Sequence, residues 1–250
     1  MDIHKPKPWR GVREFLKEYV IIVVGVMTAL GAEQGAEWLH WRHLTQQNMA
    51  RLHQAAEGAA LWSLEHNAIG GCVRGGLDGL TLRLRRPGGD WKGVNPGATG
   101  PVSTWLPPAM FMGMRQWPHT AWESALSSGV LVHLPTFWAT EYGRIFDDSN
   151  AMREQQQIAS SLMAELAPLA LDQTLTVQDK AHYLTVISQL EGALNLEDSI
   201  ATNLLIFAAE DGFWPRPSFI ARVIPLDRAT RGACVRDLDR ETYRKMPSPR

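Results

Sequence analysis

The feature that most constrains this chain is an uncharged apolar run near its start, from Tyr19 to Ala32, with charged residues on both sides. As a helix its 14 residues would cover about 21 Å, which is less than the roughly 30 Å hydrocarbon core of a bilayer. Extending the helix from Phe15 to Trp38 gives about 36 Å. The sequence therefore predicts a transmembrane helix, which we place at residues 19–39.

Charge on the two sides of this run predicts its direction. The permanent cations before it are Lys5, Lys7, Arg10, Arg13 and Lys17. The first one after it is Arg42. Because the cation-rich flank of a span normally stays in the cytoplasm, we expect residues 1–18 to form a cytoplasmic basic lead and the rest of the chain to lie on the other side.

Two other interpretations of the run stay open. Ala29-Leu30-Gly31 resembles a small-residue cleavage site, so the segment could be a cleaved signal peptide. Its length also suits a buried helix of a soluble domain. An uncleaved anchor is favoured over the signal peptide because the helical pattern continues through Glu33 and Gln34 without a break.

Small residues follow a helical spacing inside the predicted span. They are Gly25, Ala29, Ala32 and Ala36. This spacing places them on one face, where a second helix can approach closely, and it suggests a homo-oligomer formed through the transmembrane helix. The alternative is that small residues are simply common in membrane helices.

Beyond the span the pattern predicts a stalk helix at residues 40–67 that continues the membrane helix. Asn67 and the glycine pairs Gly70-Gly71 and Gly75-Gly76 are expected to stop it. Residues 77–86 then form a short helical element. Residues 87–118 are rich in Pro and Gly and predict a long irregular loop, whose aromatic residues suggest that part of it packs back on the helices.

Three helices are predicted in residues 120–212. A capping box at Thr120–Glu123 opens a short helix that ends at Gly129. A longer helix begins at Pro135-Thr136 and ends before Pro168. The third starts from a second capping box, Thr176–Asp179, and stops at Asp211-Gly212.

The predicted fold class is therefore mainly α: an N-terminal transmembrane helix continuing into a stalk, then an α-helical bundle with one long irregular loop. The helical domain covers residues 68–212. Residues 213–250 contain several prolines and predict an irregular C-terminal tail, apart from a helical turn near Asp237–Tyr243.

Two stretches resemble a group of bacterial single-pass membrane proteins to which no activity is assigned. Residues 13–30 read REFLKEYVIIVVGVMTAL and are similar to the anchor of that group. Residues 120–135, TAWESALSSGVLVHLP, followed by Tyr142, are similar to a mid-chain pattern of the same group. The resemblance implies a single-pass, mainly helical protein of the bacterial envelope, and it carries no activity over. Together with the charge asymmetry, we expect an inner-membrane anchor with the C-terminal domain in the periplasm.

Composition and motifs point away from two function classes. A formal net charge of -1 argues against a general nucleic-acid binder. The sequence contains no nucleophile elbow, P-loop, zincin or dinucleotide-binding signature, so no catalytic residue, cofactor or metal ligand is assigned. We expect an interaction or structural module of the cell envelope whose partners are the lipid bilayer and an unknown protein. The alternatives are an envelope enzyme with a site under the 87–118 loop, and a sensor or signalling subunit.

Several polar groups have ordinary explanations. His119 and Glu123 could share a metal, but a capping role explains Glu123. His40 and His43 lie at the expected membrane interface, where histidines can sense pH but polar residues are common. The adjacent pair Asp147-Asp148 should point apart on a helix. A basic cluster is predicted from Arg74, Arg83, Arg85 and Arg86.

Cys72 and Cys234 are the pair with the most specific prediction. Each lies in a turn-like context that contains glycine. In an oxidising compartment a disulfide between them would tie the C-terminal tail to the end of the stalk. In a reducing compartment they would be two ordinary thiols.

Overall fold

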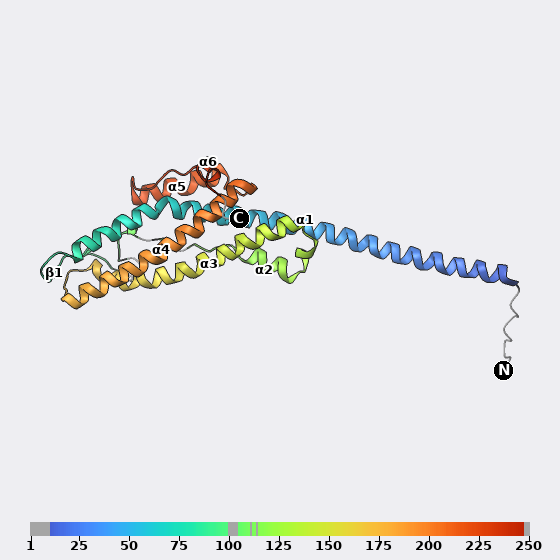
Figure 1. Ribbon diagram of the computed structural model, residues 1–250, viewed down its shortest axis with the longest axis horizontal. Coiled ribbons are helices and arrows are strands. Elements are labelled where there is room, and N and C mark those ends of the chain that lie inside the picture. The colour runs from blue at the N-terminus through green and yellow to red at the C-terminus, as the bar shows by residue number, and fades with distance from the viewer. Residues whose placement is uncertain (1–10, 100–104, 111, 114, 248–250) are drawn as a thin grey trace, which may run out of the picture.

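One helix dominates the computed structural model, which describes residues 11–99, 105–110, 112–113 and 115–247. Helix α1 (Gly11–Leu84) is 74 residues long, about 110 Å at the normal helical rise. Its first thirty residues project freely from the rest of the molecule, and its second half runs through the helical domain (Figure 1). The mainly α fold with a long N-terminal helix is confirmed.

The predicted end of the stalk at residue 67 is wrong, because α1 continues without interruption to Leu84. Each helical glycine costs up to about 1 kcal/mol relative to alanine. Packing offsets this cost, since Val73, Leu77, Leu80 and Leu84 are all buried. Glycine at position 76 also makes room for the loop, because a Cβ there would overlap the side chain of Met110.

Two further long helices pack with α1 to form the body of the domain. Helix α3 (Thr136–Leu166) and helix α4 (Val177–Asp211) lie against each other, and α4 also lies along α1 (Figure 1). The predicted capping box of α4 is present, with Thr176 and Asp179 exchanging hydrogen bonds, and Gly212 ends the helix with a φ of 85°. Both long helices were therefore predicted closely from capping and periodicity.

Helix α2 (Thr120–Ser127) begins where predicted but without the capping box. His119 occupies the N-cap position and Thr120 is already helical, so the hydroxyl of Thr120 cannot accept from the third helical N–H. Gly129 follows with a φ of 70°, as expected for a helix stop, and leads into the 3₁₀ helix η3 (Val130–His133).

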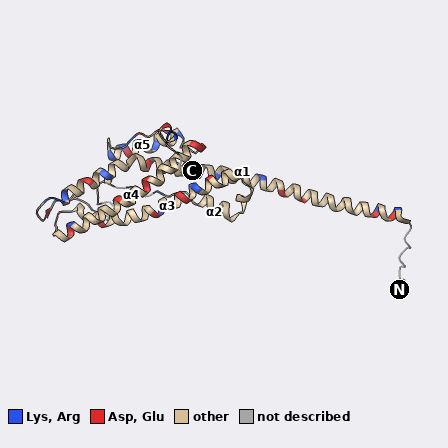
Figure 2. Ribbon diagram, viewed as in Figure 1, with Lys and Arg blue, Asp and Glu red and all other residues tan. Residues whose placement is uncertain are grey.

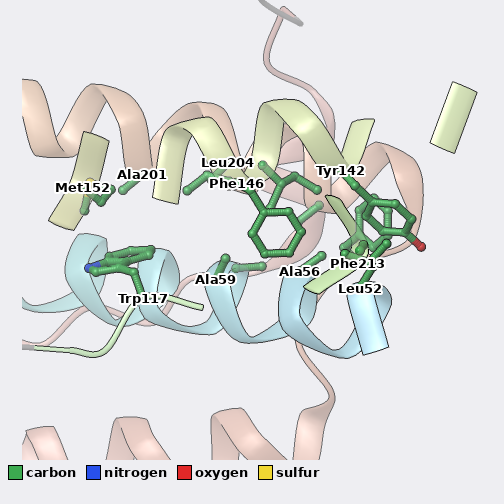
Figure 3. Packing of buried hydrophobic residues seen from close by; sticks show 14 of the residues in the cluster. Leu52, Ala56, Ala59, Trp117, Tyr142, Phe146, Met152, Ala201, Leu204 and Phe213 are labelled. Atoms are coloured by element: carbon green, nitrogen blue, oxygen red, sulfur yellow. The ribbon is translucent and has the colours of Figure 1, made fainter. Parts of the chain in front are cut away.

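An aromatic core lies between α1, α3 and α4 at the end of the domain that is nearer to the free part of α1. Small residues of α1, Ala56 and Ala59, face the ring of Phe146 from α3 (Figure 3). Tyr142 and Phe213 lie together at one end of this core, with ring centroids 5.6 Å apart. Alternation of small and large side chains lets the helices approach closely, which explains why this end of the bundle is well packed.

The 87–118 loop is more ordered than its composition predicts, in the part the structure describes. It contains the strand β1 (Asp90–Trp91), which pairs antiparallel with β2 (Gln173–Thr174), and the 3₁₀ helix η2 (Pro108–Met110). Trp91 is buried, and its Nε1 donates at 2.8 Å to the carbonyl oxygen of Leu169 in the 3₁₀ helix η4 (Ala167–Ala170). The expectation that aromatic residues pack this loop back on the helices is confirmed for Trp91 and Trp117, while Phe111 lies outside the described residues.

The C-terminal segment differs from the predicted irregular tail. It forms helix α5 (Pro217–Arg231) and the short helix α6 (Arg240–Arg244), which pack against α1 and α4 (Figure 1). Pro217 lies in the first turn of α5, where a proline is tolerated. The predicted turn near Asp237–Tyr243 corresponds to α6.

The free part of α1 has the composition of a membrane segment. Figure 2 shows few charged residues along it and many on the domain. Among the described residues this is the one helix long and apolar enough to cross a membrane, and its apolar window is not buried by the rest of the chain. The interpretation of this run as a buried soluble helix is therefore wrong.

Candidate functional site

Three consecutive polar residues of α1, Glu65, His66 and Asn67, are all buried. Successive helical residues point about 100° apart, so their burial means that α1 is enclosed on several sides at this turn. Each faces a different part of the domain. We define the polar cluster as these residues and the charged or hydroxyl groups that they contact.

His66 lies between two carboxyl groups of α4. One ring nitrogen, Nε2, is 2.9 Å from Oδ1 of Asp198, and Nδ1 is 3.4 Å from Oε2 of Glu197. Arg74 contacts the other oxygen of Asp198 at 2.7 Å. Burial opposes ionisation of Asp198, but the hydrogen bond from His66 and the charges of His66 and Arg74 together lower its pKa. Of the two carboxyl groups that flank His66, Asp198 is therefore the ionised one.

Glu197 is in a different environment. It is 0% exposed, and neither carboxylate oxygen has a hydrogen-bond partner among the described residues. Burial raises the pKa of Glu197 to about 7, against the opposing effect of His66. The 3.4 Å separation from His66 is close enough for an ion pair but is not an aligned hydrogen bond.

Glu197 also lines a narrow cavity of about 20 Å³. The remaining lining is mostly apolar and comes from α1, α3, α4 and Met112 of the 87–118 loop. This volume holds about one water molecule. Small-molecule sites usually occupy 300–1,000 Å³, so this cavity is too small for a substrate.

Glu65 connects α1 to the loop and to α5. Arg115 makes a two-pronged contact with its carboxylate, and Arg115 Nε donates to Oε2 at 2.7 Å. Burial raises the pKa of Glu65, the hydrogen bonds from Arg115 oppose this rise, and the nearby carboxyl of Asp227 adds to it. The guanidinium of Arg115 also lies 4.9 Å from the ring centroid of Trp62. Arg115 therefore holds the end of the loop against α1.

Asn67 and the disulfide hold the C-terminal segment on α1. The amide of Asn67 lies 3.2 Å from the hydroxyl of Tyr243 in α6. Cys72 and Cys234 are bonded, with their Cα atoms 5.2 Å apart, as the sequence analysis predicted. One turn of α1 therefore joins the loop, α4 and the C-terminal helices.

The structure separates most of the other sequence candidates. Arg74 pairs with Asp198, whereas Arg85 and Arg86 are exposed near the far end of α1, so the predicted four-residue basic cluster does not form. The ring of His119 contacts the carbonyl oxygen of Trp117, which lies 3.1 Å from Nδ1, and does not form the predicted pair with Glu123. Within the described ranges no group of three or more potential metal-binding side chains is found.

The remaining candidates keep the positions that a helix dictates. Asp147 is exposed and Asp148 is half-buried, yet both line one surface pocket. Burial raises the pKa of Asp148 to about 6, and the charge of Asp147 adds to this rise, so, contrary to expectation, the two carboxyl groups are not independent. A Cβ at Gly25 would meet no other heavy atom within 4 Å, and Ala29, Ala32 and Ala36 are exposed. The small-residue face is therefore accessible in the single chain.

The polar cluster was not predicted from the sequence. A signal was present, because Glu65-His66-Asn67 interrupts an apolar stretch of a helix that contains Leu64, Ala68 and Ile69. Its partners lie about 130 residues further along, at Glu197 and Asp198, and no spacing rule connects such distant positions. Comparison with protein-family models, with curated proteins and with solved structures finds no match to this chain.

Proposed function

We propose that this chain is a single-pass protein of the bacterial inner membrane. Its N-terminus lies in the cytoplasm, and its helical domain lies in the periplasm as an interaction or structural module of the cell envelope. The observation that carries the proposal is the continuity of α1, whose exposed apolar part and whose buried part belong to one unbroken helix.

Lipid is the natural cover for the exposed part of α1. Val20, Ile21, Ile22, Val24 and Met27 are each at least half exposed on all sides of the helix. An apolar surface of this extent is unfavourable in water, and a bilayer removes it from water. The cation asymmetry around the run supports the proposed direction. The disulfide fits an oxidising compartment such as the periplasm.

A groove at the end of the domain farthest from the free part of α1 supports an interaction role. We call it the distal groove; it lies between residues 84–89 and 175–184 and has a volume of about 590 Å³. Its lining combines the apolar Leu84 and Val177 with Arg85 and Arg86. This chemistry suits an acidic protein segment that also presents an apolar side chain.

Site-specific photocrosslinking in living cells tests the interaction role. A photoreactive amino acid at Val177, which is 85% exposed in the groove, should crosslink a partner. The same residue at Leu196, exposed on the middle of α4, is the control. Crosslinking at Val177 that disappears in an Arg85→Ala/Arg86→Ala variant would support the proposal. Equal crosslinking at both sites, or none at either, would contradict it.

The homo-oligomer remains a proposal of the same kind. Its support is the exposed face formed by Gly25, Ala29, Ala32 and Ala36. Single-molecule counting of the full chain in lipid vesicles tests it, because Ala29→Leu should convert dimers to monomers if helices meet at this face. Only monomers for the unaltered chain would remove the proposal.

A second candidate is an envelope enzyme with its site under the 87–118 loop. The observation that favours it is that Glu197, with a pKa of about 7, lines a small cavity that Met112 of the loop also lines. An acid with this pKa suits general acid–base chemistry at neutral pH. Incubation of envelope extracts with the full chain and with Glu197→Gln, followed by mass spectrometry, should reveal a product that only the unaltered chain makes. Identical extracts would exclude this candidate.

A further inference from the structure

The domain has an apolar corner at the end from which the free part of α1 emerges. This corner comprises the end of α2, η3 and the first turn of α3 (Figure 1). Val132 is 84% exposed, and Leu126 and Phe137 are each about half exposed. From Ser124 to Thr140 the sequence contains no Lys, Arg, Asp or Glu.

A ring contact fixes the position of this corner along α1. The ring of His133 stacks on Trp41, with the centroids 4.0 Å apart and the planes 25° from parallel. Val130 and Leu134 on either side are buried against the aromatic core, so η3 is held firmly to α1. The corner therefore lies beside Trp41.

Helix geometry places Trp41 at the membrane surface. If residues 19–39 span the hydrocarbon core, Trp41 lies two residues further, about 3 Å along the axis. The headgroup layer on each side is about 5–7 Å deep. Tryptophan is enriched in this layer, and Trp38 and Trp41 both fit it. The exposed apolar side chains of the corner then lie at the depth of the lipid headgroups.

We infer that the corner formed by Leu126, Val132 and Phe137 rests in the headgroup layer of the bilayer, as a second membrane contact beside the α1 span. This inference rests on the proposed membrane anchoring of α1. The contact removes Val132 and its neighbours from water, and the uncharged stretch around them avoids the cost of placing ions there. Two contacts instead of one fix the tilt and rotation of the domain on the membrane.

Depth-dependent fluorescence quenching tests the inference on the full chain in vesicles of phosphatidylethanolamine and phosphatidylglycerol. The two native cysteines are bonded, so a single added cysteine can be labelled selectively with an environment-sensitive fluorophore. The three labelling sites are Val132→Cys in the corner, Val24→Cys in the span and Val177→Cys at the distal groove. Val132 and Val177 are 84% and 85% exposed, so they are matched in residue type and exposure.

Nitroxide lipids labelled at shallow or deep positions serve as quenchers. At position 132 we expect vesicles to shift the emission to the blue and the shallow quencher to reduce it. At position 24 the deep quencher should reduce the emission, and at position 177 neither quencher should reduce it. A label at Leu126 should repeat the result for position 132 and guards against a local disturbance.

The remaining outcomes separate the inference from its premise. Quenching at 24 but not at 132 or 126 would overturn the membrane contact while the span stands. A blue shift at 132 without lipid quenching would mean that a second copy of the chain covers the corner, which also overturns the inference. No quenching at position 24 would overturn the membrane anchoring itself, and the corner contact with it.

Discussion

Nδ1 of His66 lies 3.4 Å from Oε2 of Glu197 in the interior of the domain, and both side chains are buried. Nε2 of the same ring contacts Asp198, so His66 lies between two carboxyl groups. Ionisation of Glu197 therefore places a second negative charge beside a small, mostly apolar cavity, which is costly.

The first prediction is a fall in stability as the pH rises. The pKa of Glu197 is raised from its ordinary value of 4.5 to about 7 in the folded chain. Between these values the folded chain binds the proton more strongly than the unfolded chain does, so the free energy of unfolding decreases with pH, by up to about 3 kcal/mol. Urea unfolding of the full chain in detergent micelles between pH 4.5 and 8, followed by tryptophan fluorescence, measures this slope.

Glu197→Gln should reduce that slope by the share of Glu197, because the amide keeps the shape of the side chain without ionising. The raised pKa of Asp148, about 6, contributes over the same pH range and should leave the rest of the slope in place. Glu154→Gln, on the exposed side of α3, is the control and should leave the slope unchanged. If the unaltered chain and Glu197→Gln show the same pH dependence, Glu197 does not titrate as described.

The second prediction concerns the disulfide. Cys72 and Cys234 are separated by 162 residues, and in the chain-entropy model a bridge of this span stabilises by up to about 5 kcal/mol. Cys72→Ala/Cys234→Ala should therefore lower the urea midpoint, and limited proteolysis should cut α5 and α6 first because they lose their covalent tie to α1. An unchanged midpoint and cleavage pattern would show that noncovalent packing alone holds the C-terminal helices.

The third prediction concerns the pair Glu65 and Arg115. Arg115→Ala leaves the buried carboxylate of Glu65 without its cation, and we expect a loss of about 2 kcal/mol, because the arginine is partly exposed. Arg115→Lys should not restore the stability, since lysine cannot make the two-pronged contact. Combining Arg115→Ala with Glu65→Gln should recover part of the loss. A double variant no more stable than Arg115→Ala would argue against an unpaired charge as the cause.

The fourth prediction tests how the 87–118 loop is fixed to the bundle. A Cβ at Gly93 would overlap the backbone of Ala170 and Leu171, where Gly93 N donates to Oδ1 of Asp172 at 2.8 Å. Gly93→Ala should destabilise the domain by about 2 kcal/mol through this overlap. Gly97→Ala is the matched control, because nothing lies near its side-chain position. Equal urea midpoints for the two variants would contradict this close approach.

Capping residues in the sequence predicted the helices whose ends they mark. Thr176 with Asp179, and Gly212, mark α4 because the capping groups lie within a few residues of each other. The same reasoning failed for α1 beyond residue 67, where glycines that weaken an isolated helix are offset by burial against distant segments. It also failed for α5, whose prolines suggested irregular structure although Pro217 is compatible with a first helical turn.

Pairing across long distances in the chain was harder to predict. The Cys72–Cys234 bond was predicted because only two cysteines offer a partner to each other. Glu65, His66 and Glu197 have many alternative partners of suitable charge, so only the packing of α1 against α4 and the loop selects among them. The corner beside Trp41 likewise depends on the fold, because it arises from the stack of Trp41 on His133.

We propose that α1 anchors a periplasmic domain and is not removed. Labelling of Val177→Cys in spheroplasts with a membrane-impermeant maleimide, followed by alkaline extraction of the membranes and gel electrophoresis, tests both parts of this proposal. We expect labelling without lysis, on a chain of 27.9 kDa plus label that stays in the membrane fraction. Labelling only after lysis, or on a shorter chain released from the membrane, would contradict it.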